Sequence, residues 1–326
     1  MNVRRLIPTT AVAGAVALGL VTLSACGGGS DAADKGGSES GGKLDVVASF
    51  YPLQFLAEQI GGSYVTVDTL TKPGVEPHDL ELKPKQIGEL GTADVVLYLK
   101  GIQPAVDDAI AQSDADTKID AATLTKVEEH GTEVGHDHGA EHGSEEHAGE
   151  GEAGTDPHIW LDPVKYGEVA QGVGAAFEKA DPAHAAAYKA NTQALMTRLA
   201  ALDGEFRTGL KNTSTKTFIT THSAFGYLAE RYGLEQEGIS GMDPESEPSP
   251  ARIKELQDIA KKDKVTTVFF ETLASDKTAK TLASDTGLRT DVLDPLEGIT
   301  DASKGDDYIE VMQSNLAALK KALGAK

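Results

Sequence analysis

Short apolar runs of strand length alternate with longer amphipathic stretches from residue 44 onward. The runs at 44–49, 64–70 and 94–99 combine Val and Leu with few breaks, as buried strands do. Between them, residues 53–62 and 83–93 have the apolar spacing of helices, and each contains a glycine near its end. This first series predicts strands and helices in alternation.

A second series repeats the pattern nearer the C-terminus. Its predicted strands are residues 217–221, 265–271 and 290–294, and its predicted helices are residues 224–233, 249–263 and 276–287. Strands that alternate with helices are typical of parallel α/β units. The chain is therefore expected to be an α/β protein with two lobes, each a mostly parallel sheet flanked by helices.

The segment between the two series has the pattern of one long helix. Asp181 is a plausible N-cap and Pro182 suits the first helical position. Apolar side chains recur at helical spacing from Tyr188 to Phe206. The expected organisation is an N-terminal lobe at 44–180, a long rigid connecting helix at 181–210 and a C-terminal lobe at 211–326.

The N-terminus has the pattern of a secretory leader. Arg4 and Arg5 precede an apolar run at 11–23, which is short for a membrane span and suits a signal peptide. The sequence "LSAC" then leads into Cys26, the only cysteine of the chain, and resembles the lipobox of bacterial lipoproteins. We expect a signal peptide at 1–25, lipidation of Cys26 and a Gly/Ser-rich tether at 26–43. The alternative is an ordinary secretory signal followed by a buried cysteine.

The charge balance points away from nucleic acid. With 30 Lys and Arg against 51 Asp and Glu, the formal net charge is −21. Phosphate backbones are bound by Lys and Arg, whereas an acidic protein suits a cationic ligand.

An acidic, histidine-rich segment lies near the middle of the chain. Residues 127–156 contain ten acidic residues and no Lys or Arg, and too few apolar residues to build a packed core. Such composition indicates metal binding, with a solubilising insertion as the alternative. We expect a disordered accessory loop that captures extra metal through His130, His136, His138, His142 and His147, and whose removal leaves the rest of the protein folded.

Of the four remaining histidines, His78 and His222 follow predicted strands, and His158 lies between the histidine-rich segment and a helix. His78 follows the strand at 64–70, His158 lies in "DPHIWLDP", and His222 directly follows the strand at 217–221. Ligands of open α/β sheets bind at the carboxyl ends of the strands. The fourth histidine, His184, lies in the predicted long helix, where a solvent-facing role is expected.

Three imidazoles with one carboxylate form the set of four ligands that tetrahedral Zn²⁺ favours. The stretch "DVLDPLEG" supplies two candidates for the carboxylate, Glu297 and, as the alternative, Asp294 beside Pro295. Histidine ligands usually donate their second ring N–H to a carboxylate or carbonyl. Asp79, Asp156 and Asp162 are close enough in sequence to serve.

The motifs that carry these residues resemble a known family, the metal-binding lipoproteins of ABC importers for zinc and manganese, particularly its zinc-specific branch. The matching stretches are "PGVEPHDLELKP", "DPHIWLDP", "THSAFGYLAERYGL" and "FFETLAS…LDPLEG", with "DDYIEVMQSNLAALKKAL" closing the chain. Together they cover the chain from about residue 44 to its end.

The resemblance implies two α/β lobes joined by a rigid helix, with the metal between them. His78, His158 and His222 match the three histidine ligand positions of the family, and His222 stands where manganese importers tend to carry a carboxylate. The fourth ligand varies in the family between Glu, Asp and water. The implied function is capture of Zn²⁺ outside the cytoplasm and its delivery to an ABC transporter permease, by a monomer anchored to the outer face of the cytoplasmic membrane.

Three alternatives stay open at this stage. Manganese or ferrous iron are rival cargoes of the same transporter class. An adhesin or a metal chaperone without a transporter is a second reading. A zinc hydrolase is a third, but the chain has no HExxH and no G-x-S-x-G motif, so an enzyme is not expected.

Overall fold

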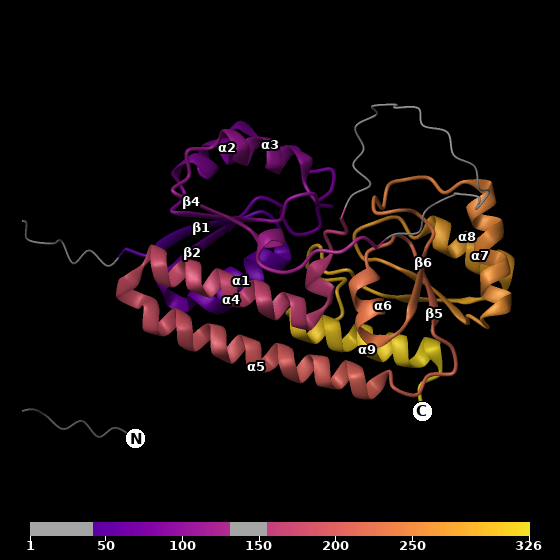
Figure 1. Ribbon diagram of the computed structural model, residues 1–326. Coiled ribbons are helices and arrows are strands. Elements are labelled where there is room, and N and C mark those ends of the chain that lie inside the picture. Colours follow the sequence, from indigo (N-terminus) through magenta and orange to yellow (C-terminus); the bar gives the residue numbers. More distant parts are fainter. Residues whose placement is uncertain (1–41, 131–154) are drawn as a thin grey trace, which may run out of the picture. The chain divides into compact units, whose positions relative to one another are not determined.

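Two parallel sheets form the framework of the computed structural model, which describes residues 42–130 and 155–326 (Figure 1). The first sheet has the strand order β2-β1-β3-β4, with every neighbouring pair parallel. Its strands and the helices between them are β1 (Leu44–Ala48), α1 (Tyr51–Gly61), β2 (Val65–Thr69), α2 (Pro84–Thr92), β3 (Val95–Tyr98), α3 (Pro104–Gln112) and β4 (Thr117–Asp120).

The second sheet repeats this topology with the order β6-β5-β7-β8, again all parallel. Its elements are β5 (Thr217–Thr220), α6 (Gly226–Tyr232), β6 (Glu235–Gly238), α7 (Pro250–Lys262), β7 (Thr267–Phe270), α8 (Lys277–Thr286), β8 (Arg289–Val292) and α9 (Tyr308–Leu323). The predicted α/β fold with two parallel-sheet lobes is confirmed.

Along the chain, two consecutive helices connect the strands of the first sheet to those of the second: α4 (Pro163–Ala180) and α5 (Ala185–Gly209). A short 3₁₀ turn, Pro182–His184, separates them, so the long helix begins at 185 and not at 181 as predicted. Helix α5 has 25 residues and is about 38 Å long at about 1.5 Å per residue. It packs along α4, α1 and α9, and in Figure 1 it runs beneath elements of both sheets.

The buried apolar side chains form a middle layer that continues from one sheet to the other. On the first sheet Val46 faces this layer while Val47 faces a separate cluster under α2 and α3. On the second sheet Phe218 faces it while Ile219 faces a separate cluster under α7 and α8. The alternation follows from strand geometry, since successive side chains point to opposite faces. Helices α1, α4, α5, α6 and α9 share the middle layer, so the two lobes have one core in common.

Helix α9 adds a second connection between the lobes. The Tyr308 ring at its start lies 5.5 Å from Phe55 of α1 and 4.5 Å from Tyr166 of α4, centroid to centroid. The Tyr308 hydroxyl donates to the Trp160 carbonyl over 2.5 Å. Farther along, α9 packs against β5 and β8 of the second sheet. Two helices, α5 and α9, therefore bridge the lobes.

The helix ends differ from prediction in places. Gly62, with φ 56°, closes α1 as expected, but α2 ends at Thr92 with Ala93 as its cap and no glycine at that position. The sequence pattern gave no range for α3, α4, α9, β4 or β6. The predicted signal peptide, Cys26 and nearly all of the tether lie outside the described residues, as do His136, His138, His142 and His147. Among the residues that are described, no helix has the length and apolar content needed to cross a membrane.

Candidate metal centre

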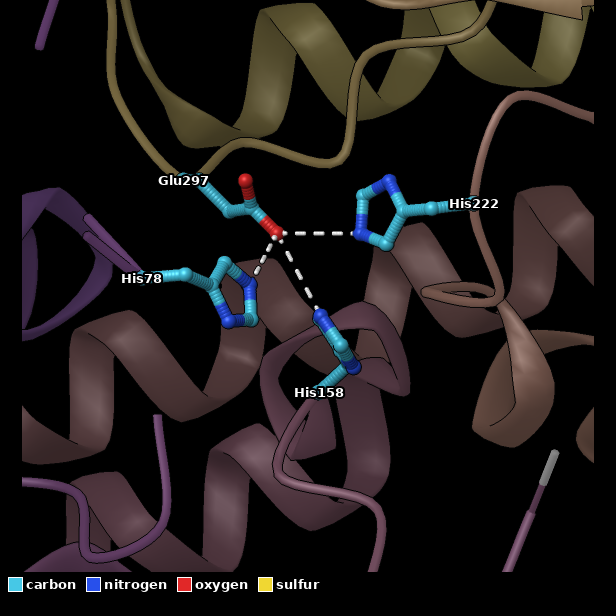
Figure 2. Close-up of side chains that lie close together, drawn as sticks. All are labelled: His78, His158, His222 and Glu297. Carbon is cyan, nitrogen blue, oxygen red and sulfur yellow. Dashed lines mark hydrogen bonds and ion pairs between the residues drawn. The ribbon is translucent and has the colours of Figure 1, made fainter. Parts of the chain in front are cut away.

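Four side chains from widely separated parts of the sequence meet at one point (Figure 2). His78 lies in the loop after β2, His158 caps the 3₁₀ turn Ile159–Leu161, His222 follows β5, and Glu297 follows β8. Three of the four therefore lie beyond the carboxyl ends of parallel strands, two in the second sheet and one in the first. Such edges are where open α/β sheets place their ligands.

The distances in this cluster match those around a tetrahedral ion. The Nε2 atoms of His78, His158 and His222 each lie 3.3 Å from Oε1 of Glu297. Ligand atoms about 2.0 Å from a tetrahedral zinc ion lie about 3.3 Å from one another. All four ligand atoms lie within 4.8 Å of each other. The arrangement can hold one divalent cation with no change of fold.

Glu297 reaches the cluster because the turn before it is held firmly. Leu296 is fully buried and has a positive φ of 59°, a conformation that is uncommon outside glycine and often found at functional sites. Its backbone N–H donates to Asp294 Oδ1 over 2.8 Å, and Trp160 Nε1 donates to the Pro295 carbonyl over 2.7 Å. The turn therefore aims the Glu297 side chain at the three imidazoles.

Asp294, the alternative fourth ligand, is turned away from the cluster. Its Oδ1 accepts from Leu296, its Oδ2 accepts from Thr272 Oγ1 over 3.1 Å, and its backbone is held by Asn315 of α9. Burial raises the pKa of the Asp294 carboxyl. The side chain shapes the turn that presents Glu297, which supports Glu297 over Asp294 as the ligand.

Asp156 orients the His158 ring. The His158 Nδ1–H donates to Asp156 Oδ1 over 2.8 Å, and the His158 backbone N–H donates to the same oxygen over 2.9 Å. This leaves Nε2, which is buried without a hydrogen-bond partner, facing the cluster. Burial opposes a charge on His158, but the carboxylates of Asp156 and Glu297 outweigh it and raise the pKa of the ring. Asp156 thus has the role that one of the three predicted aspartates was expected to have.

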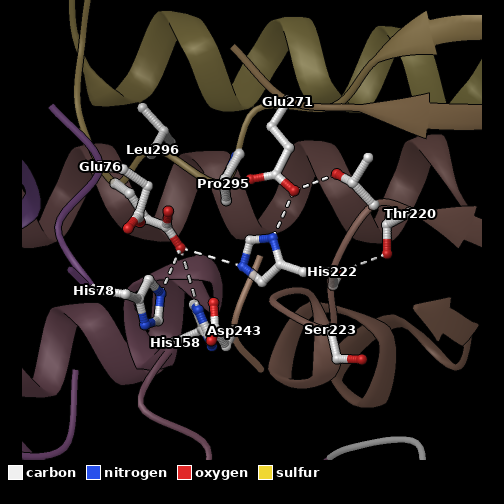
Figure 3. Close-up of polar contacts among 12 residues, drawn as sticks. Glu76, His78, His158, Thr220, His222, Ser223, Asp243, Glu271, Pro295 and Leu296 are labelled. Atoms are coloured by element: carbon white, nitrogen blue, oxygen red, sulfur yellow. Dashed lines mark hydrogen bonds and ion pairs between the residues drawn. The ribbon is translucent and has the colours of Figure 1, made fainter. Parts of the chain in front are cut away.

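Glu271, which follows β7, orients His222 in the same way and was not predicted. The His222 Nδ1–H donates to Glu271 Oε1 over 2.6 Å, and Thr221 donates to the same oxygen. Figure 3 shows Glu271 on one side of the ring, and Figure 2 shows Glu297 facing its Nε2 atom on the other. Burial again opposes the charged ring, yet these two carboxylates raise the pKa of His222 well above its usual value. The glutamate is the last residue of the apolar run 265–271, where the sequence pattern marked only a strand.

The other two predicted aspartates do not orient a histidine. Asp162 accepts from the Val164 N–H at the start of α4 and pairs with Arg231, whose Nε donates to it over 2.7 Å. Asp79 contributes its backbone N–H to Glu76 over 3.3 Å. Burial and the nearby Glu297 carboxylate raise the pKa of Glu76 to about 7, although His78 acts in the opposite direction.

His78 is the most accessible member of the cluster. Its side chain is 13% exposed, whereas those of His158, His222 and Glu297 are at most 1% exposed. His78 also lines a surface pocket of about 350 Å³, together with Thr155 and Pro157 from the end of the histidine-rich segment. An ion can therefore approach the cluster from the His78 side.

The net charge of the cluster depends on what fills it. Burial opposes the Glu297 carboxylate, but the surrounding histidines hold its pKa well below the usual range. The carboxylates beside His158 and His222 raise the pKa of both rings at the same time, so protons and a cation compete for these ligands.

The remaining histidines divide into two groups. His184 lies in the 3₁₀ turn before α5, not within the long helix, where its Nδ1–H donates to Asp181 over 2.6 Å and its ring stacks on Tyr64. Its side chain is 27% exposed and belongs to neither group of potential metal ligands found among the described residues. His130 is the one histidine of the segment 127–156 that the structure describes, and it lies near Glu128 and Glu230.

Fold and cluster together define a class of protein: two parallel α/β lobes on a long helix, with three imidazoles and one carboxylate gathered as a candidate metal centre. The chain belongs to the family described as zinc-uptake complex component A, periplasmic, whose sequence model matches residues 46–322.

Individual relatives support this membership. The high-affinity zinc uptake system protein ZnuA of Bacillus subtilis is 37% identical over 318 residues, which cover 95% of this chain and 97% of that protein. The zinc-binding lipoprotein AdcA of Streptococcus pneumoniae is 36% identical over 289 residues. That match covers 87% of this chain and 56% of the relative, so this chain spans little more than half of the longer protein.

Solved structures share the fold. The Zn(II)-bound ZnuA-like domain of Streptococcus pneumoniae AdcA superposes with a TM-score of 0.70 and 33% identity, covering 86% of this chain and 99% of that one. The laminin-binding protein Lmb of Streptococcus agalactiae, described as bifunctional with adhesin and metal transporting activity, has a TM-score of 0.74 and 29% identity, with coverages of 86% and 99%.

Proposed function

We propose that this protein captures Zn²⁺ outside the cytoplasm and delivers it to the permease of an ABC transporter. The observation that carries the proposal is the equal spacing of 3.3 Å between Glu297 Oε1 and the Nε2 atoms of His78, His158 and His222. This is the donor set and spacing of a four-coordinate zinc site. Membership of a zinc-uptake family supports the same cargo.

The ligand chemistry favours zinc over its rivals. Three imidazole nitrogens and one carboxylate oxygen suit Zn²⁺, whereas Mn²⁺ prefers oxygen ligands and a higher coordination number. Glu271 and Asp156 strengthen this preference because they keep the His222 and His158 rings oriented with Nε2 inward. Manganese and ferrous iron are expected to bind more weakly.

The site is arranged for transport and not for catalysis. Four protein ligands close a tetrahedral site, whereas a catalytic zinc keeps an open position for water. The relatives named above are zinc uptake and zinc-binding proteins. The proposal therefore assigns no reaction to the cluster. The adhesin activity in the description of Lmb belongs to that protein. No contact among the described residues of this chain favours an adhesin function.

Lipidation of Cys26 and anchoring to the outer face of the cytoplasmic membrane belong to the same proposal. They are supported by the "LSAC" sequence and by the relative described as a zinc-binding lipoprotein. A monomer is expected, because the two lobes supply every ligand of the cluster from one chain. Delivery to a permease rests on the family's place in a zinc-uptake complex.

The histidine-rich segment is proposed to capture additional zinc weakly and pass it toward His158. Thr155, near the end of the segment, and Pro157, just after it, line the pocket beside His78, so the end of the segment lies at the access route to the cluster. Each loop site must pay the entropy of ordering several residues, so it should bind more weakly than the preformed cluster.

Competitive loading tests the cargo directly. Metal-stripped protein is incubated with an equimolar mixture of Zn²⁺, Mn²⁺ and Fe²⁺ under anaerobic conditions, and the bound metals are measured by elemental analysis after desalting. We expect the tightly held equivalent to be zinc. Retention of manganese or iron in its place would overturn the proposal.

A further inference from the structure

A second group of metal-ligating side chains lies where the histidine-rich segment leaves the fold. His130 Nε2 is 2.8 Å from Oε2 of Glu230 on α6, and ligand atoms of Glu128, His130 and Glu230 lie within 4.8 Å of one another. His130 and Glu230 line a surface pocket of about 350 Å³. This group, called the root site below, is separate from the four ligands of the primary cluster.

The backbone around the root site is fixed. The Asp156 N–H donates to the Glu128 carbonyl over 2.9 Å, which joins the two ends of the segment. The Tyr227 hydroxyl accepts from the Glu128 N–H and donates to the Asp156 carbonyl, each over 2.8 Å. Glu128 is therefore held against α6 by its own backbone contacts.

The His130 ring is seated closely on the start of α6. A Cβ atom added to Gly226 would lie 2.4 Å from the His130 Cβ and 2.9 Å from Asp156 Oδ2, so only glycine leaves room there. The Tyr227 ring packs against the imidazole at 4.4 Å in an edge-on arrangement. The His130 side chain is consequently only 17% exposed, although it begins an acidic, polar segment.

The ring is also oriented as a metal ligand would be. Its Nδ1 lies 3.1 Å from Asp156 Oδ2 and can donate to it, which leaves Nε2 facing the pocket. The other oxygen of the same carboxylate accepts from His158 Nδ1. Asp156 therefore orients one histidine of the primary cluster and one histidine of the root site.

We propose that Glu128, His130 and Glu230 form a second, weaker site for a divalent transition-metal ion. The inference rests on the proposed zinc function. In that function, the root site would bind a Zn²⁺ ion between the histidine-rich segment and the primary cluster. One imidazole and two carboxylates are an acceptable set for Zn²⁺, and water can complete the coordination. Moderate affinity is expected because Glu230 is 60% exposed and Lys165 Nζ, 3.1 Å from Glu128 Oε1, competes for that carboxylate.

The test uses the full-length chain with His136, His138, His142 and His147 all replaced by Ala, so that those imidazoles contribute nothing. Zn²⁺ alone is the probe, added to metal-free protein in competition with chelators of graded affinity. We expect two equivalents, one tight and one weaker. In this background Glu230→Gln should weaken the second equivalent at least about tenfold while leaving the first unchanged. Glu245→Gln, at an exposed glutamate that belongs to neither metal group, is the matched control.

The same background separates this inference from the primary assignment. His222→Ala should remove the tight equivalent and keep the weaker one, and an anomalous zinc peak in crystals of the parent should lie between His130 and Glu230. A single equivalent in the four-histidine background, or the same second affinity in Glu230→Gln and Glu245→Gln, would overturn the root site. If His222→Ala instead kept the tightly bound zinc equivalent, that result would count against the proposed function.

Discussion

The primary cluster and the root site share a plan and differ in their surroundings. In both, a histidine turns Nδ1 toward Asp156 and Nε2 toward a glutamate, Glu297 in one case and Glu230 in the other. Glu297 is 1% exposed, while Glu230 is 60% exposed. The primary cluster adds two further imidazoles, and the root site adds one carboxylate that already pairs with Lys165.

This difference shows that the number of histidines in a region is a poor guide to metal affinity. The segment 127–156 contains five of the nine histidines of the chain, yet the tight site is expected where three histidines are held by separate elements. A buried donor that is already oriented needs no ordering when the ion binds, whereas donors on a polar segment do. Fixed orientation and low exposure are therefore the features that separate a strong site from a weak one.

The largest effect is expected from removing a ligand of the primary cluster. His222→Ala should lower zinc affinity by more than about 100-fold, because the effect should exceed the 10- to 100-fold typical of residues that only orient a ligand. His184→Ala is the matched control, since His184 lies outside both metal groups. Chelator competition measures both variants. Equal losses in the two would refute the ligand assignment.

Next come the carboxylates that orient the ligands. Glu271→Gln and Asp156→Asn should each weaken the tight equivalent by about 10- to 100-fold, because each leaves a ring nitrogen less well held. Only Asp156→Asn should also weaken the root site, since Asp156 alone contacts both His130 and His158. Zinc titrations that resolve both equivalents provide the measurement. If Glu271→Gln also lowered the zinc affinity of the root site, the prediction that Asp156 alone links the two sites would be wrong.

Acidification should weaken the tight site beginning above the usual histidine pKa of about 6.5. Burial opposes the charged rings of His158 and His222, but the carboxylates beside them raise both pKa values. Protons therefore compete with zinc at a higher pH than they would for free imidazole, and affinity should fall by about tenfold per pH unit for each proton displaced. Competition titrations across about pH 8 to about pH 5.5 test this. A constant affinity over that range would contradict it.

Deleting residues 130–147 should leave the tight site almost unchanged. The ends of the segment stay joined through the Asp156 N–H to Glu128 carbonyl bond and through Tyr227, so the backbone before His158 keeps these contacts when residues 130–147 are removed. The variant should fold, keep one tight zinc and lose the weaker equivalents, including the root site with His130. Cells that carry it should grow worse only when zinc is scarce. Abolition of the tight site would mean that the segment forms part of it.

The smallest effect is expected on molecular dimensions. Helices α5 and α9 and the shared core connect the lobes, so removal of zinc should change the radius of gyration by little more than the error of solution scattering. Local rearrangement around His158 and slight tilting of the lobes are expected. A large difference between metal-free and zinc-loaded protein would indicate hinge closure and would contradict this expectation.

The apolar pattern was enough to predict most of the framework. The central strands β1, β3, β5 and β7 followed from runs such as 94–99, because parallel strands buried on both faces have few polar residues. The edge strands β2 and β8 were predicted from runs that are only partly apolar. The missed strands β4 and β6 are edge strands with the sequences TKID and EQEG. Their backbones pair with β3 and β5, but their side chains carry almost no apolar signal, so hydropathy alone could not reveal them.

His78 and His222 could be proposed as ligands because each follows a predicted strand, and His158 because it lies in the motif "DPHIWLDP". Their partners were less predictable. Asp156 was one of three equivalent aspartates in the sequence, and Glu271 was hidden at the end of a strand. Asp294 and Glu297 were distinguished by a buried turn with a positive φ at Leu296, a property of the backbone that the sequence does not display.

The shared core also limits what a transport partner can recognise. With α5 and α9 connecting the lobes, a loaded and an empty molecule are expected to have nearly the same outline over most of their surface. Any difference is then expected in the loops that carry His78, His158, His222 and Glu297, where the ion would add its charge. A permease that accepts only the loaded form would then have to inspect this face at close range. Selectivity for cargo would be decided by contact with a few loops and not by a change in the shape of the whole protein.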